Sequence, residues 1–225
     1  MELTILGATG RTGIRVLRKA IEAGHTVRAV VRNRTKLESM ITSSGEGDIA
    51  RPDALSIAEA DLLDGEAMRE AIAASRVVVY AAGPVKGAPA DMPVRAAENI
   101  LAAMKAGAGE KLVWLTGAGV LDERDGKSGS RKVIRGLMKL VAGKVLAASE
   151  DAYALVTQSG LTYVVVRPPM LADEPGGTDL AAGYEPPKPI PLGRADLGAF
   201  LVEVATNDRY DNESPFVSYL RRGTS

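Results

Sequence analysis

The chain has no cysteine and a single histidine among its 225 residues. Without cysteine there can be no disulfide, no thiolate nucleophile and no cysteine-ligated metal. One histidine cannot build a histidine-rich zinc site either, so we predict no metal in the functional site. The histidine, His25, stands in a short turn sequence and is expected at the surface rather than in a catalytic role.

A net charge of either sign is also missing, because 28 basic residues balance 28 acidic residues. Nucleic acid is not an expected partner, since no basic field would attract it. No apolar run approaches the roughly 20 residues of a membrane span, and no secretory leader is expected. The expectation is a cytoplasmic protein without integral membrane contact that acts on a small molecule, as a monomer or a weak homo-oligomer.

Glycine, in contrast, is concentrated at one turn near the N-terminus. Residues 3–6 form an apolar run, an amphipathic helical pattern follows, and residues 27–31 form a second apolar run. This order predicts a strand–turn–helix–strand unit of the size of one βαβ crossover. Glycines at such a turn let the backbone approach a dinucleotide pyrophosphate, which the N–H groups of the helix N-terminus then face. The turn glycines are Gly7, Gly10 and Gly13.

The spacing of these glycines, GxxGxxG, differs from the GxGxxG of the common dinucleotide fingerprint. Three glycines alone are a weak signal, and a tight turn that binds nothing is the alternative interpretation. Their position after one apolar run and before a helix, with a second apolar run beyond the helix, favours a cofactor site.

The end of the second predicted strand distinguishes the two nicotinamide cofactors. An NAD site places Asp or Glu there to bind the ribose 2′-hydroxyl, whereas this chain has Arg32, followed by Arg34 and Lys36, and no acid before Glu38. A guanidinium suits the 2′-phosphate of NADP because its donors form a planar fork, and Arg11 in the glycine turn could flank the same phosphate. NADP(H) is therefore the predicted cofactor, and solvated loop cations are the alternative.

Apolar strands alternate with helical patterns along the rest of the chain. Strands that are apolar along their whole length indicate a parallel sheet covered on both faces. We predict an α/β fold with a single Rossmann-type doubly wound parallel sheet, helices on both faces, and one domain over residues 1–225. The expected later strands are residues 55–60, 76–80, 111–115 and 161–166, and the expected later helices are residues 35–43, 64–73, 94–106, 131–158 and 195–206.

Residues 167–225 are expected to complete the substrate side of the pocket. Among them, the Pro- and Gly-rich residues 175–191 are predicted to form a loop over the pocket, and residues 216–220 an edge strand. Residues 131–148 read as an amphipathic surface helix, with a pocket lid or an interfacial helix as alternatives. The acids expected in a solvated loop are Asp122, Glu123 and Asp125.

Several segments together resemble one family. They are GATGRTG at the glycine turn, VVR at the second strand end, EADLLD (59–64), ENILAAMKA (98–106), SGLTYVVVRPP (159–169) and the tail 196–219. The chain resembles the atypical short-chain dehydrogenases/reductases of the NAD(P)-binding, NmrA-like family, and is most similar to their flavin reductase / biliverdin-IXβ reductase type. The resemblance implies a Rossmann sheet, NADPH as hydride donor, and a flat conjugated acceptor such as a flavin, a quinone or a linear tetrapyrrole.

The resemblance also implies a role for each residue that matches a family motif. The pyrophosphate is assigned to Gly7, Thr9, Gly10, Thr12 and Gly13. The 2′-phosphate is assigned to Arg32, and the adenine is bordered by Asp61 and Leu62. The ribose on the nicotinamide side is approached by Ala81, Ala82 and Gly83, and the nicotinamide itself by Thr116 and Pro168.

The chain departs from these relatives in two places. The Tyr-x-x-x-Lys pair of ordinary short-chain dehydrogenases is absent, because Val145 and Ser149 stand where it would fall. The Thr-Ser that follows the fifth strand in flavin and biliverdin reductases is Thr116-Gly117 here, so biliverdin specificity does not follow. A flavin or quinone can take its proton from water, so alignment of the hydride is the main demand on the protein.

Thr116 and Tyr153 are the catalytic candidates. The Thr116 hydroxyl could bond the nicotinamide amide or the acceptor, and a strand-end threonine bonded to backbone is the alternative. Tyr153 could reach the pocket from its helix, and a half-buried packing tyrosine is the alternative. The predicted function is an NADPH-dependent reductase acting on a small flat acceptor. The alternative is a non-catalytic, NADP(H)-sensing regulator of the NmrA-like kind.

Overall fold

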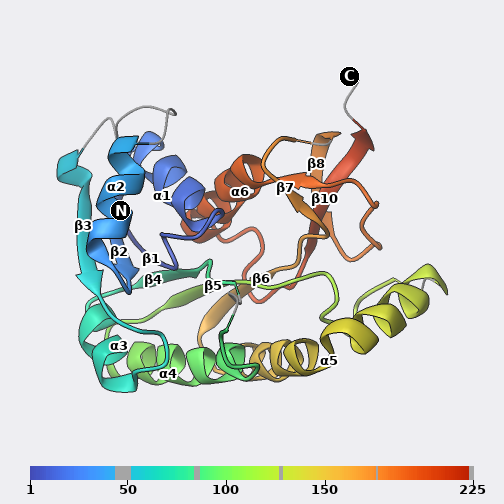
Figure 1. Ribbon diagram of the computed structural model, residues 1–225, viewed down its shortest axis with the longest axis horizontal. Helices are drawn as coiled ribbons and strands as arrows, with labels where there is room; N and C mark the ends of the chain where they lie inside the picture. Colours follow the sequence, from blue (N-terminus) through green and yellow to red (C-terminus); the bar gives the residue numbers. More distant parts are fainter. Residues whose placement is uncertain (44–51, 84–86, 127–128, 176, 223–225) are drawn as a thin grey trace.

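A central parallel sheet organises the chain in the computed structural model, which describes residues 1–43, 52–83, 87–126, 129–175 and 177–222 (Figure 1). Six strands lie in the order β3-β2-β1-β4-β5-β6, which is the order of the doubly wound dinucleotide-binding fold. The predicted fold class is therefore confirmed. The strands are β1 (Glu2–Leu6), β2 (Thr26–Val31), β3 (Leu55–Glu59), β4 (Val77–Tyr80), β5 (Lys111–Leu115) and β6 (Thr162–Val166).

Helices cover both faces of this sheet. One face carries α1 (Gly13–Glu22), α2 (Arg34–Ser43) and α6 (Arg194–Thr206), and the other carries α3 (Gly65–Ile72), α4 (Met92–Ala106) and α5 (Gly129–Thr157) (Figure 1). A short 3₁₀ turn, Pro52–Ala54, precedes β3. Each predicted element begins and ends within two residues of the observed one.

Alternate residues of the strands feed two separate cores. In β4, Val77 and Val79 belong to the core under α1 and α6, whereas Val78 and Tyr80 belong to the core under α3, α4 and α5. This alternation follows from the two-residue period of a strand, and it explains why the strands are apolar along their whole length. In the second core the Tyr80 ring stacks on Trp114 with 3.8 Å between centroids.

The start of α3 shows how local sequence sets an element boundary. The Asp64 carboxylate accepts hydrogen bonds from the backbone N–H groups of Glu66 and Ala67, at 3.1 and 3.0 Å. These bonds satisfy two of the N–H groups that a helix N-terminus leaves without an intrahelical partner. Asp64 therefore caps α3 and fixes the loop between β3 and α3.

The C-terminal third adds two small sheets beside the main one. β7 (Leu171–Ala172) pairs in parallel with β9 (Leu192–Gly193), and β8 (Gly177–Gly183) pairs antiparallel with β10 (Phe216–Arg222). The prediction of a loop over residues 175–191 was therefore wrong in part, because β8 lies within it. Its sequence, GTDLAAG, has few of the β-branched and aromatic residues that mark a strand.

The predicted strand at residues 216–220 is present, but it does not extend the main sheet. The chain runs past the end of β6 before it enters β10, with isolated bridges of Val164 with Glu213 and of Arg167 with Phe216, and the N–H of Asn212 donates to the carbonyl of Tyr163 on β6. Two prolines, Pro168 and Pro169, follow Arg167. They have no N–H to donate to a neighbouring strand, so pairing beside β6 stops there and β10 pairs with β8 instead.

The long helix α5 contains the amphipathic residues 131–148. Side chains of residues 129–142 lie outside the described part of the molecule, so the two predicted faces of this segment are not described. Among the helices that are described, none has both the length and the apolar character of a membrane span.

Candidate functional site

The glycine turn between β1 and α1 is held by its own backbone. The N–H of Gly10 donates to the carbonyl of Gly7 at 2.9 Å, and the N–H of Ile14 donates to the carbonyl of Gly10 at 3.0 Å. Gly7 has φ 85°, a conformation that side-chain-bearing residues rarely adopt. A Cβ on Gly13 would lie 2.2 Å from the Gly7 carbonyl oxygen. Gly7 and Gly13 are thus required by the shape of the turn itself.

A cleft of about 440 Å³ opens beside this turn. It is bounded by the loops that follow the first four strands of the chain, at the carboxyl edge of the sheet, which is where doubly wound folds bind ligands. Eight of the predicted cofactor residues line it: Gly7, Thr9, Gly10, Arg32, Asp61, Leu62, Ala82 and Gly83. Lys36, which the sequence placed among the basic residues after the second strand, also lines the cleft. The lining residues that sequence reasoning missed are Val30, Val31, Ala60, Leu63, Gly87, Ala88, Pro89 and Met92.

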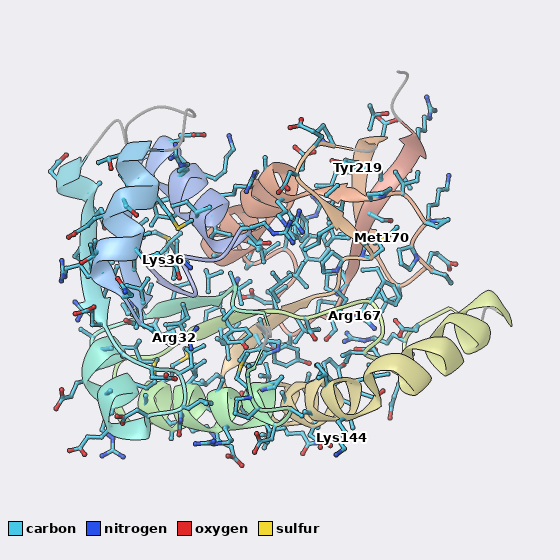
Figure 2. The ribbon with its side chains drawn as sticks, in the orientation of Figure 1. Arg32, Lys36, Lys144, Arg167, Met170 and Tyr219 are labelled. Atoms are coloured by element: carbon cyan, nitrogen blue, oxygen red, sulfur yellow. The ribbon has the colours of Figure 1, made fainter. Side chains whose placement is uncertain are left out.

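Two cations stand at the β2 end of the cleft. Arg32 and Lys36 both line it (Figure 2), and within the described residues neither side chain is engaged in an ion pair. Arg34 differs, because its guanidinium donates to the carbonyl of Ile57 and lies 3.8 Å from the Glu38 carboxylate. Only two of the three basic residues that follow β2 are therefore placed to meet an anion in the cleft.

The turn after β3 forms another wall of the cleft. Asp61 accepts a hydrogen bond from the N–H of Leu63 at 2.9 Å, and the side chain of Asn99 on α4 donates to the carbonyl of Leu62 at 2.9 Å. The turn is thus fixed both by its own acid and by the neighbouring helix. Asn99 lies within the ENILAAMKA segment, and its role was missed because nothing local to it marks a partner 37 residues away.

The predicted nicotinamide residues Thr116 and Pro168 lie together, but outside this cleft. The N–H of Thr116 donates to the carbonyl of Val166, and the N–H of Ala118 donates to the carbonyl of Pro168, both at 3.0 Å. The ends of β5 and β6 are thereby tied to each other. The Thr116 hydroxyl makes no hydrogen bond to another described residue, so the backbone-bonded threonine considered as an alternative is not observed.

Four further predicted residues are absent from the cleft lining, namely Gly13, which shapes the turn as described above, and Ala81, Thr12 and Arg11. Ala81 is buried, and its N–H donates to the carbonyl of Leu6 at 3.0 Å. The carbonyl of Thr12 accepts from the N–H groups of Arg15 and Val16, which starts helix α1. Arg11 points elsewhere: its guanidinium lies 3.6 Å from the Asp173 carboxylate. The Arg11 side chain therefore does not line the cleft in which the 2′-phosphate is predicted to bind.

Tyr153 projects from α5 to an acid that follows β5. Its hydroxyl donates to the Asp122 carboxylate at 2.6 Å. Burial, together with this hydrogen bond, raises the pKa of Tyr153 to about 12. Burial also acts to raise the pKa of Asp122, but the hydrogen bonds from Arg124 and Tyr153 outweigh it and the net result is a pKa well below the usual value. At neutral pH the pair is a neutral phenol bonded to a carboxylate.

The prediction of a solvated acidic loop was therefore wrong for two of its three acids. The side chains of Asp122 and Asp125 are each only 4% exposed, whereas Glu123 is exposed. Asp125 pairs with Arg167, which is fully buried, at 2.6 Å. The same guanidinium donates to the carbonyls of Ser214 and Val120 at 2.7 and 2.9 Å. A buried charge needs such partners, because removing it from water without them is costly.

A second chain of polar contacts joins this loop to the C-terminal sheets. Arg124 contacts both Asp122 and Glu213, and its guanidinium lies over the Tyr184 ring. The Tyr184 hydroxyl donates to Glu213, and burial together with this bond raises the pKa of Tyr184. The loop after β5 is thus anchored to β6, α5 and the segment before β10. Within the described ranges, no three acids or histidines converge as metal ligands.

A comparison with known families identifies the class of ligand. A model of NAD(P)H-binding proteins matches residues 7–208, which include the glycine turn, both cleft cations and the C-terminal strands up to β9. The chain belongs to this NAD(P)H-binding family. Membership agrees with the predicted resemblance to NmrA-like, biliverdin-reductase-type proteins, and it supports a nicotinamide dinucleotide as the cofactor of the chain.

Individual relatives are distant in sequence. Protein TIC 62 of the pea chloroplast (Pisum sativum) is 28% identical over an alignment of 179 positions that covers 73% of this chain and 32% of that protein. The chain thus spans about a third of the length of this curated relative. ChuY, an anaerobilin reductase from Escherichia coli O157:H7, superposes with a TM-score of 0.76 at 16% identity over all of both chains. A short-chain dehydrogenase/reductase from Veillonella parvula superposes at 0.75 with 15% identity, covering 97% of this chain and 94% of the other.

Proposed function

We propose that the chain is an NADPH-dependent reductase that transfers hydride to a flat conjugated acceptor, a flavin or a quinone. The observation that carries the proposal is the pair of cations, Arg32 and Lys36, facing the cleft beside the glycine turn. A 2′-phosphate at this point would meet two positive charges. The ribose 2′-hydroxyl of NAD would meet no carboxylate on β2 or in the Arg32–Lys36 segment, although such a carboxylate is the usual partner of that hydroxyl.

The residues of the cleft fit a dinucleotide. Gly10 brings bare backbone to the cleft wall, Leu62 offers an apolar edge for the adenine, and the N-terminus of α1 directs its N–H groups to the pyrophosphate position. When bound, NADPH supplies a hydride, which is two electrons and one proton, and a second proton from water completes the two-electron reduction of the acceptor. The protein's own part is to hold the two rings in contact and aligned.

Thr116 is the polar group proposed to orient the reaction. Its hydroxyl is not committed to another described residue and stands at the end of β5, where a nicotinamide amide can accept or donate a hydrogen bond. Tyr153 is less suited to act as a proton donor, because its proton is already shared with Asp122 at 2.6 Å. A solvent proton is sufficient for a flavin or quinone, so neither residue needs to be a general acid.

Exposed apolar side chains at the same edge of the sheet as Thr116 favour the binding of a flat acceptor. Leu121 follows β5 and is 42% exposed, and Met170 follows β6 and is 63% exposed. Because β5 and β6 are neighbours in the sheet, both side chains belong to the same edge as Thr116 and Pro168. We propose that this surface, with residues 167–222, forms the acceptor side of the site.

The alternative function is a non-catalytic regulator that senses NADP(H). The observation in its favour is the absence of a tyrosine–lysine pair, together with the engagement of Tyr153 by Asp122. Both functions require the cofactor, so only a measurement of catalytic turnover distinguishes the reductase from the regulator. The reductase should oxidise NADPH when FMN or a short-chain quinone is added, and not without an acceptor. If no flavin, quinone or simple carbonyl compound accelerates NADPH oxidation while NADPH still binds, the sensing function replaces the reductase.

A further inference from the structure

The turn after β3 is fixed by hydrogen bonds from inside and from outside. The N–H of Asp64 donates to the carbonyl of Asp61 at 3.0 Å, and the N–H of Leu63 donates to the Asp61 carboxylate at 2.9 Å. The carbonyl of Leu62 accepts from the side chain of Asn99 at 2.9 Å. The first two bonds lie within the turn, whereas the third comes from helix α4. Asn99 therefore ties the turn to a separate element.

The N–H of Leu62 has no hydrogen-bond partner within the part of the chain that the structure describes. It belongs to the same planar trans peptide group as the carbonyl of Asp61, so the two groups point in opposite directions. Because that carbonyl points into the turn, toward the N–H of Asp64, the N–H of Leu62 points out of the turn. Asp61 and Leu62 both line the cleft, so this donor is available to a bound ligand.

The packing of two helices sets the position of the Asn99 side chain. Asn99 follows Met92 by seven residues in α4, which is about two turns, so both lie on one face of the helix. Met92 lines the cleft directly. α3 and α4 lie side by side (Figure 1), and a Cβ on Gly65, the first residue of α3, would lie 3.0 Å from Asn99 Oδ1. The glycine thus leaves room for the amide, which directs its Nδ2 to the turn.

We infer that Asn99 is a positioning residue through which the chain selects the base of its dinucleotide. By holding the carbonyl of Leu62 on the α4 side, it keeps the N–H of Leu62 and the carboxylate of Asp61 in fixed places at the cleft. A donor beside an acceptor complements the N1 acceptor and the 6-amino donor of adenine. Asn99 itself does not line the cleft, so it acts through the turn.

The inference rests on the proposed function, because it takes NADPH as the cofactor and places its adenine at Asp61 and Leu62. The reduced form of nicotinamide hypoxanthine dinucleotide phosphate is a matched probe, since it differs from NADPH only in the base. Hypoxanthine has an N1–H donor and a 6-oxo acceptor, so each group would face a like group of the turn. The wild type should bind NADPH at least about tenfold more tightly than this analogue, because both hydrogen bonds would be lost.

Two substitutions of Asn99 remove its donor in different ways. Asn99→Leu should lower the preference for NADPH over the analogue to about threefold or less, because leucine has a similar size but cannot bind the carbonyl of Leu62. Asn99→Asp should have the same effect, since a carboxylate repels that carbonyl, and its charge is compatible with the N-terminus of α3 nearby. Glu98→Gln is the control, because Glu98 is the adjacent, exposed residue of α4. Titrations followed by the fluorescence of the reduced nicotinamide give each dissociation constant.

The ratio of NADPH to NADH affinity separates positioning from a general loss of structure. That ratio is assigned to Arg32 and Lys36, so it should stay within about twofold of the wild-type value in both Asn99 variants. A fall of both ratios together would overturn the inference. Equal binding of NADPH and the hypoxanthine analogue by the wild type would also overturn it, as would an unchanged base preference in both variants. A wild type that shows the expected binding differences but reduces no acceptor would count against the reductase function alone.

Discussion

The hydroxyl of Tyr153 lies 2.6 Å from the carboxylate of Asp122 and donates its proton to it. Tyr153 comes from the long helix before β6, and Asp122 from the loop after β5, 31 residues earlier in the chain. The bond joins α5 to the loop after β5, around the proposed acceptor side, and leaves the phenol without a free proton. A tyrosine that looks from the sequence like a candidate acid is, in the structure, a fixed element of the wall.

Removal of this hydroxyl should therefore affect catalysis only modestly. We expect Tyr153→Phe to lower kcat for a flavin or quinone by less than about a hundredfold, the low end of what a general acid contributes. Thr116→Ala should behave in the same way, because alignment of the rings and not proton donation is proposed to carry the rate. Steady-state kinetics with saturating NADPH measure this. A ten-thousandfold loss in either variant at unchanged NADPH affinity would make that residue a dedicated proton donor.

The cofactor preference should depend on Arg32 and Lys36 but not on Arg34. NADPH should bind at least about tenfold more tightly than NADH, because hydrogen bonds to a charged phosphate contribute about 1.5–3 kcal/mol. Arg32→Ala should remove most of this preference, and Lys36→Met part of it. Arg34→Ala is the matched control, since its guanidinium is occupied by Ile57 and Glu38 outside the cleft. Titrations of both cofactors into each variant test the assignment; equal affinities in the wild type would contradict it.

Two glycines of the same turn should respond differently to alanine. A Cβ on Gly13 would collide with the Gly7 carbonyl at 2.2 Å, so Gly13→Ala should lower Tm and the yield of folded protein. A Cβ on Gly10 would lie at 3.2 Å from that carbonyl and would project at the cleft wall. Gly10→Ala should therefore remain folded and bind NADPH much more weakly. Thermal melts with and without NADPH separate these effects, and undiminished binding by Gly10→Ala would show that this glycine serves only the turn.

The fold and the cofactor side could be predicted because their signals are local. Each strand is an unbroken apolar run and each helix has its own period, so the order of elements can be read without any knowledge of tertiary contacts. The glycine turn and Arg32 are separated by one βαβ unit, and the carboxyl-edge rule places them together. Lys36 is close in sequence to Arg32, yet only the structure separates it from Arg34, whose guanidinium bonds to a carbonyl on β3.

The acceptor side could not be predicted, because its contacts join distant parts of the chain. Asp125 and Arg167 are 42 residues apart, and in the sequence the acid stands among other charged residues in a glycine-containing stretch that is typical of a solvated loop. The prolines after Arg167 were visible, but their effect on strand pairing depends on which segment arrives beside β6. Arg11, Arg15 and Arg194 likewise meet at Asp173 from the glycine turn, α1 and α6, and their meeting depends on how the two helices pack.

The buried ion pair between Asp125 and Arg167 should matter greatly for stability. Asp125→Asn would leave a guanidinium that is 0% exposed without its carboxylate, and breaking a buried pair in this way costs about 3–5 kcal/mol. We expect the free energy of unfolding in urea to fall by that amount. Glu110→Gln is the control, because it breaks the exposed pair with Arg76, and exposed pairs contribute little. A similar, small change in both variants would show that Arg167 is satisfied by its backbone partners alone.

The contribution of Asp122 to stability should vanish in acid. Its pKa in the folded chain lies below the value of 3.8 expected for the unfolded chain, so the folded state favours the ionised form. This stabilisation is complete above the unfolded pKa and is lost as the pH falls through the folded pKa. Asp122→Asn should therefore have a lower Tm than the wild type at neutral pH, and the difference should shrink steadily below about pH 4.

Tyr153→Phe should weaken the pH-dependent stabilisation by Asp122, because it removes one of the donors that favour the carboxylate. Melting curves of the three proteins from neutral to acidic pH measure the trend, and a Tm difference that stays constant down to the acid transition would show that Asp122 does not titrate in the way its hydrogen bonds require.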